Sequence, residues 1–168
     1  MPEQDFVRSQ GLSFLAHRLR RASELILEGT TETLRREGFA SPARAGSTLL
    51  LLRGNGPTGI TEIAYRLRLS HPLIIKLAAA LAAAGLVRDE SDPKDNRRRL
   101  IALTDKGQTE AARFDSFLGA VAGTFEAMFA EAGADLFAAL ERFEQAAERR
   151  PIPERLAAAM AREDGIPS

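Results

Sequence analysis

The chain has 168 residues, 45% of them hydrophobic and 27% charged, which is enough to bury one core in a single small domain with helical extensions. It contains no cysteine, which excludes disulfides and thiolate catalysis, and its two histidines disfavour a metal site. No apolar run approaches the roughly 20 residues that cross a bilayer, and two acids precede any apolar segment, so neither a membrane partner nor a secretory signal is expected. A soluble, cytoplasmic protein is predicted.

The first third of the chain predicts two helices. Apolar residues recur at helical spacing over about residues 6–37, and Gly38 ends this long helix. Ser41 and Pro42 then resemble an N-cap followed by proline in the first helical turn. The short helix that they would begin is apolar all round, which predicts burial. The residues that give the first helix its period are Leu12, Leu15, Leu19, Ala22 and Ile26.

The middle of the chain predicts two helices joined by a tight turn. Residues 60–68 form a short helix, and Ser70 is a suitable N-cap for a second helix that reaches Ala84. Pro72 is tolerated near the start of that helix because first-turn amides lack a helical acceptor. Gly85 is a C-cap signal.

The period then changes from helix to strand. Residues 86–90 and 99–103 predict two short strands, and the polar residues 91–98 between them predict a β-hairpin with a basic tip at Arg97, Arg98 and Arg99. Thr104 is expected to cap a long helix over about residues 105–131. Further helices follow Gly133.

This order of helix, helix, tight turn, helix and hairpin predicts a winged helix-turn-helix. The major groove of DNA admits one helix, here the one that begins at Ser70, and the hairpin tip can reach a neighbouring minor groove, where arginine is favoured. The net charge of the chain is zero, but residues 60–100 hold eight basic and five acidic residues, whereas residues 101–168 hold seven and twelve. A basic module beside an acidic helical region is compatible with DNA binding, because the docking face alone must be positive.

The hairpin and the segment after it resemble the MarR family of winged-helix regulators. The resemblance depends on Asp92-Pro93-Lys94-Asp95-Asn96-Arg97, on Ile101-Ala102-Leu103-Thr104-Asp105-Lys106-Gly107, and on Gly85-Leu86-Val87-Arg88 before the wing. It implies that Arg97 is the wing arginine and that Asp92 and Asp95 hold the loop. It also implies a small-molecule effector, although no residue here specifies a ligand. An alternative for the wing is that its acids and arginines pair only with one another.

Candidate DNA contacts follow from this arrangement. Arg66 and Arg68 belong to the helix predicted over residues 60–68 and to the turn after it. They either contact phosphates or are ordinary solvated arginines. The polar candidates for the groove are limited to the start of the second helix. In full, the expected DNA-binding residues are Arg66, Arg68, Ser70, His71, Leu73, Ile75, Lys76, Lys94, Arg97, Arg98 and Arg99.

The second helix departs from the family pattern, because it is almost entirely apolar. Ile74, Leu77 and Leu81 are expected in the core, which leaves Leu73 and Ile75 without an evident reason to be apolar. Two interpretations stay open. Leu73 and Ile75 contact thymine methyl groups, or the helix has lost base reading and meets a protein.

The predicted fold class is mostly α with a small β-hairpin wing, built as a winged helix-turn-helix module with a helical dimerisation region. We expect a dimerisation helix over residues 1–40, the DNA-binding module over 41–104, and dimerisation helices over 105–168, because the terminal segments carry more apolar side chains than a thin module can bury. The predicted function is a homodimeric regulator of transcription, a repressor of a pseudo-palindromic operator released by a small molecule. The alternative is a protein-interaction module with weakened DNA binding. No Ser/His/Asp set, Gly-rich phosphate loop or metal cluster is present, so neither an enzyme nor a cofactor is expected.

Overall fold

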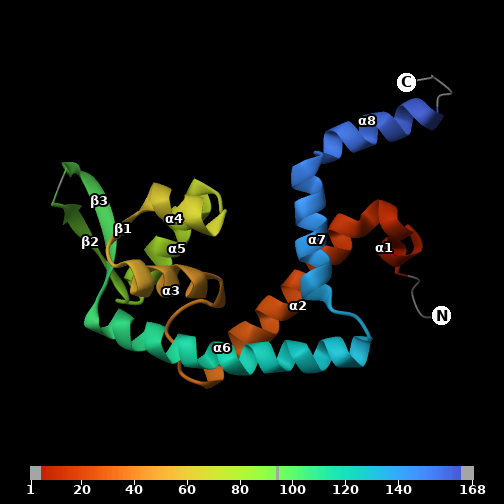
Figure 1. Ribbon diagram of the computed structural model, residues 1–168. Helices are drawn as coiled ribbons and strands as arrows, with labels where there is room; N and C mark the ends of the chain where they lie inside the picture. The colour runs from red at the N-terminus through yellow and green to blue at the C-terminus, as the bar shows by residue number, and fades with distance from the viewer. Residues whose placement is uncertain (1–4, 94, 164–168) are drawn as a thin grey trace. The chain divides into compact units, whose positions relative to one another are not determined.

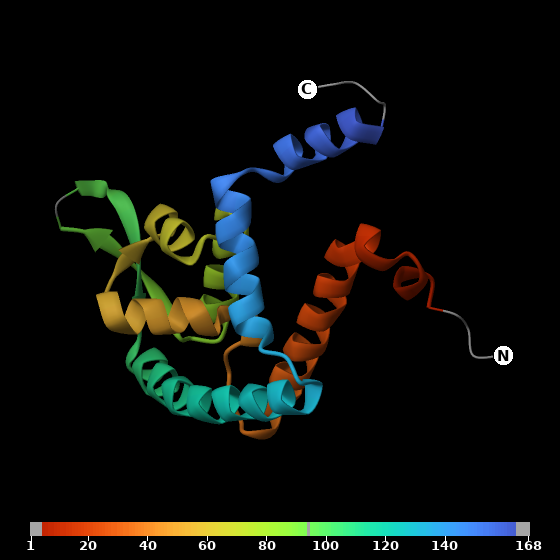
Figure 2. The same cartoon turned by 45° about the vertical axis from the view of Figure 1, so that its right-hand side comes forward.

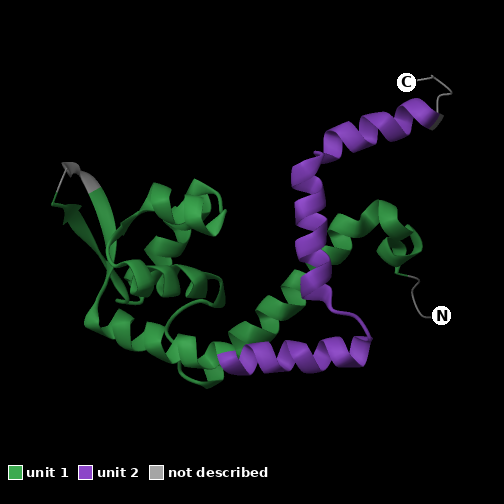
Figure 3. Ribbon diagram, in the orientation of Figure 1, with its two compact units in different colours: residues 1–118 green, residues 119–168 purple. Residues whose placement is uncertain are grey.

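The computed structural model describes residues 5–93 and 95–163, and the side chains of residues 95–98 and 163 lie outside the described part. The chain divides into two compact units, Met1–Leu118 and Gly119–Ser168 (Figure 3). Helix α6, Asp105–Ala132, begins in the first unit and continues into the second. The predicted roles of segments 1–40, 41–104 and 105–168 remain predictions. No described helix is both long and apolar enough to cross a membrane.

The first unit contains helices and a small sheet, and the strands lie at one edge of the unit (Figure 1). The single helix predicted over 6–37 is interrupted, because Gly11 adopts a left-handed conformation with φ of 61°. Before the winged module the elements are α1 Phe6–Ser9, the 3-10 helix η1 Gly11–Phe14 and α2 Leu15–Arg36. Arg21 Nη1 donates to Asp5 at 2.6 Å and lowers the pKa of that carboxyl.

The winged module begins after Gly38. Its helices are η2 Ala43–Ala45, α3 Gly46–Asn55, α4 Ile60–Leu67 and α5 His71–Ala83. The prediction that Ser41 caps the first of these is wrong. Pro42 holds the N-cap position of η2, and the Ser41 hydroxyl is buried without a hydrogen-bond partner among the described residues.

The sheet is antiparallel with the order β1-β3-β2, from β1 Thr58–Gly59, β2 Val87–Asp92 and β3 Asp95–Leu103. Thr58 pairs with Ile101, and Val87 pairs with Leu103. The predicted fold class is confirmed. The sheet also contains a third strand, β1, which the sequence did not predict because it is only two residues long. The β2–β3 hairpin stands beside α4 and extends past the helices of the module (Figures 1 and 2).

One apolar core holds the module together, with side chains from α3, α4, α5, the hairpin and the start of α6. Ile74, Leu77 and Leu81 belong to it, as the sequence predicts. The fully buried side chains are each expected to contribute about 1.5–3 kcal/mol through the hydrophobic effect. They include Leu49, Leu52, Ile63, Ile74, Leu81 and Leu86.

The segment 101–107 joins the hairpin to α6 through a group of close contacts. The amide of Thr104 donates to the Leu86 carbonyl at 3.0 Å, and its hydroxyl donates to the Gly85 carbonyl at 2.7 Å. The same hydroxyl accepts from the Gly107 amide at 3.0 Å, which is the capping bond that the sequence predicts for Thr104. A Cβ on Gly107 would lie 1.9 Å from the Leu86 carbonyl oxygen, so this approach requires glycine.

A buried carboxylate fixes the entry to the module. Glu110 on α6 exposes 5% of its surface, and its Oε1 accepts from the amides of Ala40 and Ser41, both at 2.7 Å. Two charge-assisted bonds to one carboxylate hold the segment before η2 against α6. Seventy residues separate the partners, so no local pattern announces the contact.

The second unit consists of the rest of α6 with α7 Leu136–Arg149 and α8 Ile152–Glu163. Asp135 caps α7 by accepting from the Ala138 amide at 2.9 Å. None of the described residues of α7 is buried. Large apolar side chains are exposed along both helices, namely Leu136, Phe137, Phe143, Ile152, Leu156 and Met160.

Candidate nucleic-acid interface

The turn between α4 and α5 has the compact geometry of a helix-turn-helix. Arg68 ends α4 in the left-handed region with φ of 51°, and the Leu69 amide donates to the Ala64 carbonyl at 3.0 Å. Ser70 then takes the N-cap position of α5 with extended backbone angles, as the sequence predicts. Three residues therefore connect α4 to α5, which pack against each other.

The Ser70 side chain does not make the capping hydrogen bond that its position suggests. One of the two amides that an N-cap side chain can reach belongs to the second helical residue, which here is Pro72 and has no N–H. Ser70 and His71 are both exposed at the start of α5. Their polar atoms are therefore presented to the surroundings at the end of the helix where anions are favoured.

Helix α5 is buried on one side and apolar on the other. Leu73 is half-buried and packs against the core, so the expectation that it has no structural reason to be apolar is wrong. Ile75 is different, because 51% of its surface is exposed. Within α5, all of which the structure describes, Lys76 is the one cation on the exposed side. The exposed residues of the helix are His71, Pro72, Ile75, Lys76, Ala79, Ala82 and Ala83.

The two arginines predicted on α4 and its turn are both exposed. Arg66 forms an ion pair with Glu62 one turn earlier on α4, and both side chains are about half exposed. A surface pair of this kind contributes about 0.3–0.5 kcal/mol, so a phosphate can replace the glutamate. Tyr65 on α4, which is not among the residues predicted from the sequence, exposes 80% of its surface. Its place outside the apolar face of Ile60, Ile63, Ala64 and Leu67 was the available signal.

The wing is longer than predicted, and its connection is shorter. Strands were expected to end at residue 90 and to resume at 99, but β2 reaches Asp92 and β3 begins at Asp95. Arg97, Arg98 and Arg99 therefore lie along β3 and not at the hairpin tip, which corrects the sequence prediction. The irregular register between Ser91 and Asp92 allows the pairing to continue to the end of the hairpin.

Few of the predicted wing contacts have a described side chain. Arg99 is exposed and pairs with Ser91 across the ladder. Lys94 and the side chains of Arg97 and Arg98 lie outside the described residues. Asp92 exposes 9% of its surface, which agrees with a role in holding the hairpin, as the family resemblance implies.

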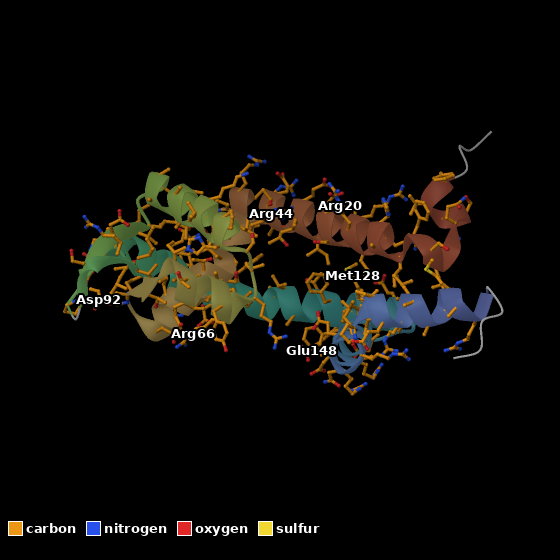
Figure 4. The ribbon with its side chains drawn as sticks, turned by 90° about the horizontal axis from the view of Figure 1, so that it is seen from above. Arg20, Arg44, Arg66, Asp92, Met128 and Glu148 are labelled. Carbon is orange, nitrogen blue, oxygen red and sulfur yellow. The ribbon has the colours of Figure 1, made fainter. Side chains whose placement is uncertain are left out.

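Two hollows flank the helix-turn-helix. The first, of about 290 Å³, lies between α5 and the strands and is mainly apolar; its lining includes Ile60, Ile75, Ala79, Ala82, Val87 and Ile101. The second, of about 540 Å³, lies between the start of α4 and the hairpin and has the charged side chains of Glu62, Arg66, Glu90 and Asp92 in its wall. Figure 4 labels Arg66 and Asp92 at the same end of the first unit. Three of the four charged side chains in the wall of the second hollow are acidic.

Part of the positive charge of the module is already neutralised. Arg88 Nη1 donates to the Leu103 carbonyl at 2.9 Å, and its Nη2 donates to Glu90 at 3.2 Å. Lys76 forms no ion pair with any residue of the described ranges.

Within the described part of the chain, no group of three or more His, Asp or Glu side chains is placed to hold a metal ion.

Comparison with known proteins agrees with this geometry. Residues 49–107 match the family model of the winged helix DNA-binding domain. No curated protein matches the chain. Among solved structures, MepR from S. aureus, in complex with DNA, is 22% identical, with a TM-score of 0.66 over 79% of this chain and 96% of that chain.

Two further structures have the same fold. The PcaV transcriptional regulator from Streptomyces coelicolor, in complex with its natural ligand, is 24% identical, with a TM-score of 0.63 over 88% of this chain and 99% of that chain. A transcriptional regulator of the MarR family from Rhodococcus sp. RHA1 is 25% identical, with a TM-score of 0.58 over 89% of this chain and 99% of that chain.

The structure and the matched domain define a winged helix-turn-helix protein. Within that class the chain has the fold of the MarR-family regulators, and the resemblance predicted from the wing motif and the segment after it is confirmed.

Proposed function

We propose that the protein is a DNA-binding regulator of transcription that acts in the cytoplasm as a homodimeric repressor. The observation that carries the proposal is the succession of α4, tight turn, α5 and hairpin within the matched winged helix DNA-binding domain. The solved structure of MepR bound to DNA supports it, because that protein has the same fold. In this proposal α5 enters the major groove, and the hairpin follows the adjacent backbone or minor groove.

The proposed DNA contacts divide by chemistry. Ser70, His71, Ile75 and Lys76 lie on the exposed part of α5 or at its start and would meet base edges or nearby phosphates. Three exposed arginines would meet phosphates: Arg66 on α4, Arg68 in the turn and Arg99 in the wing. Lys94, Arg97 and Arg98 are proposed from the sequence alone. Leu73 is withdrawn from this set because it packs against the core.

The homodimer is proposed because the helices outside the module expose large apolar side chains. Phe137 exposes 73% of its surface, Leu156 58% and Met160 63%. A run of such side chains in an isolated chain is typical of an interface, and a two-fold dimer buries the same surface on both copies. Two copies of α5 would then read the two halves of a pseudo-palindromic operator.

The proposal includes release of the repressor from DNA by a small molecule. PcaV, which shares the fold, is solved with its natural ligand. We propose that a small-molecule effector shifts this protein between states with different affinity for DNA. No described residue identifies the effector.

Selection of bound duplexes from a random DNA pool tests the proposal. Enrichment of an inverted repeat, with half-sites about one helical turn apart (about 10–10.5 base pairs), is the expected result. The variant Ala79→Glu places a negative charge on the exposed side of α5 and should weaken binding to the enriched duplex. The control Ser47→Glu adds the same charge to an exposed position of α3 and should not. A pool without enrichment would contradict the proposal and favour the protein-interaction alternative, to which the apolar α5 surface also corresponds.

A further inference from the structure

The exposed side of α5 has an unusual chemistry for a surface that reads bases. Between Pro72 and Ala83 it presents hydrocarbon from Ile75 and three alanines, together with the ammonium of Lys76. The helix cannot turn to offer other side chains, because Ile74 and Leu81 expose none of their surface on the opposite side. The residues that meet a base edge are therefore set by the core.

Ile75 is the largest apolar group on this surface. Its surface is 51% exposed, and the rest is covered by the protein. Ile75 also lines the 290 Å³ hollow between α5 and the strands, as Ile60 and Val87 do. A side chain that is supported on one side and presented on the other has a defined position from which to make one contact.

An apolar surface in the major groove distinguishes base pairs through their methyl groups. The A·T pair presents three polar atoms in that groove, N7 and N6 of adenine and O4 of thymine, and the G·C pair also presents three, N7 and O6 of guanine and N4 of cytosine. Hydrocarbon side chains satisfy neither set, so desolvation costs much the same for both pairs. The difference that remains is the C5-methyl group of thymine.

A cytosine methylated at C5 carries a methyl group at the same ring position as thymine. We propose that α5 is a methyl-group reader, which accepts 5-methylcytosine in place of thymine at the bases that Ile75 contacts. Binding at such a site would therefore depend on the methylation state of the DNA wherever the base is cytosine. Lys76 adds preference for a purine acceptor, such as guanine O6 or N7, at a neighbouring position. This inference rests on the proposed function and specifies which DNA the protein binds.

Base replacement in the selected duplex tests the inference with the unaltered protein. At each thymine of a half-site, one duplex replaces thymine with uracil, one replaces T·A with C·G, and one replaces T·A with 5-methylcytosine·G. At the contacted thymine we expect uracil and cytosine to weaken binding about fourfold or more, because burial of one methyl-sized group is worth about 0.8 kcal/mol. The 5-methylcytosine duplex should bind within about twofold of the thymine duplex.

Two variants separate methyl reading from other causes. With Ile75→Ala the four duplexes should bind with nearly equal affinity, whereas Lys76→Ala should weaken all four and preserve their order. Because the base replacements use unaltered protein, they give an answer even if a variant fails to fold. A 5-methylcytosine duplex as weak as the cytosine duplex would overturn the inference, as would uracil without effect at every thymine. If the thymine duplex still binds tightly, either of these two results overturns methyl reading and leaves the proposed function intact. If the protein prefers no duplex at all, both methyl reading and the proposed function are overturned.

Discussion

Replacement of Gly107 with alanine should destabilise the winged module at its junction with α6. The new Cβ would lie 1.9 Å from the backbone oxygen of Leu86, where ordinary contact begins near 3.4 Å. The Leu86 carbonyl cannot retreat freely, because it accepts the Thr104 amide at 3.0 Å. Relief of the overlap therefore requires movement of backbone on both sides of the contact.

The cost of this change can be estimated from its parts. Overpacking of a well-packed site costs about 1–3 kcal/mol, and loss of the Thr104–Leu86 hydrogen bond costs about 1 kcal/mol more. Alanine returns about 0.5–1 kcal/mol because it is a better helix former than glycine. We therefore expect the free energy of unfolding to fall by about 1–3.5 kcal/mol.

Urea denaturation followed by circular dichroism measures this difference, at one protein concentration because a dimer makes stability concentration-dependent. Gly119→Ala is the matched control, since Gly119 lies on the same helix and an added Cβ there meets nothing within 4 Å. The control should gain about 0.5–1 kcal/mol from helix propensity. A Gly107→Ala protein as stable as the original would show that α6 does not approach the Leu86 backbone this closely.

Further predictions concern assembly, the wing and oxidation. Light scattering should give about twice the chain mass of 18.2 kDa, and Leu140→Lys should shift the mass toward that of the monomer. A measured mass of 18.2 kDa for the unaltered protein would exclude the dimer. Arg97→Ala with Arg98→Ala should weaken binding to every duplex and lower the slope of log affinity against log salt by about 1 for each phosphate that is no longer neutralised, whereas an unchanged slope would remove these arginines from the interface. Mild peroxide should leave DNA affinity unchanged because the chain has no cysteine, and a decrease reversed by dithiothreitol would be incompatible with that composition.

Most of the fold could be predicted because its signals are local. The period of α4 and α5, the N-cap position of Ser70 and the change to strand after Gly85 all appear in short windows of sequence. The boundaries of the wing were less visible. Polar residues 91–98 indicate a turn by composition, yet residues 91–92 belong to β2 and residues 95–98 to β3, and the register of these strands depends on the whole hairpin.

Contacts between distant residues could not be predicted. The sequence around Glu110 does not indicate that its carboxylate accepts hydrogen bonds from amides about seventy residues earlier. The sequence around Gly46 does not indicate that the Phe114 ring would lie 2.1 Å from an added Cβ. The same reason applies to Leu73 and Ile75, which are both aliphatic and two positions apart. The packing of α5 on the module covers Leu73 and leaves half of Ile75 exposed.

The central claim is that α5 and the wing recognise a specific DNA sequence as a dimer. Titration of the selected inverted repeat and of a scrambled duplex of equal length, at physiological salt, tests it most directly. We expect two chains per duplex and an affinity for the repeat that is about 10³-fold or more above that for the scrambled duplex. Equal affinity for the two duplexes would contradict it.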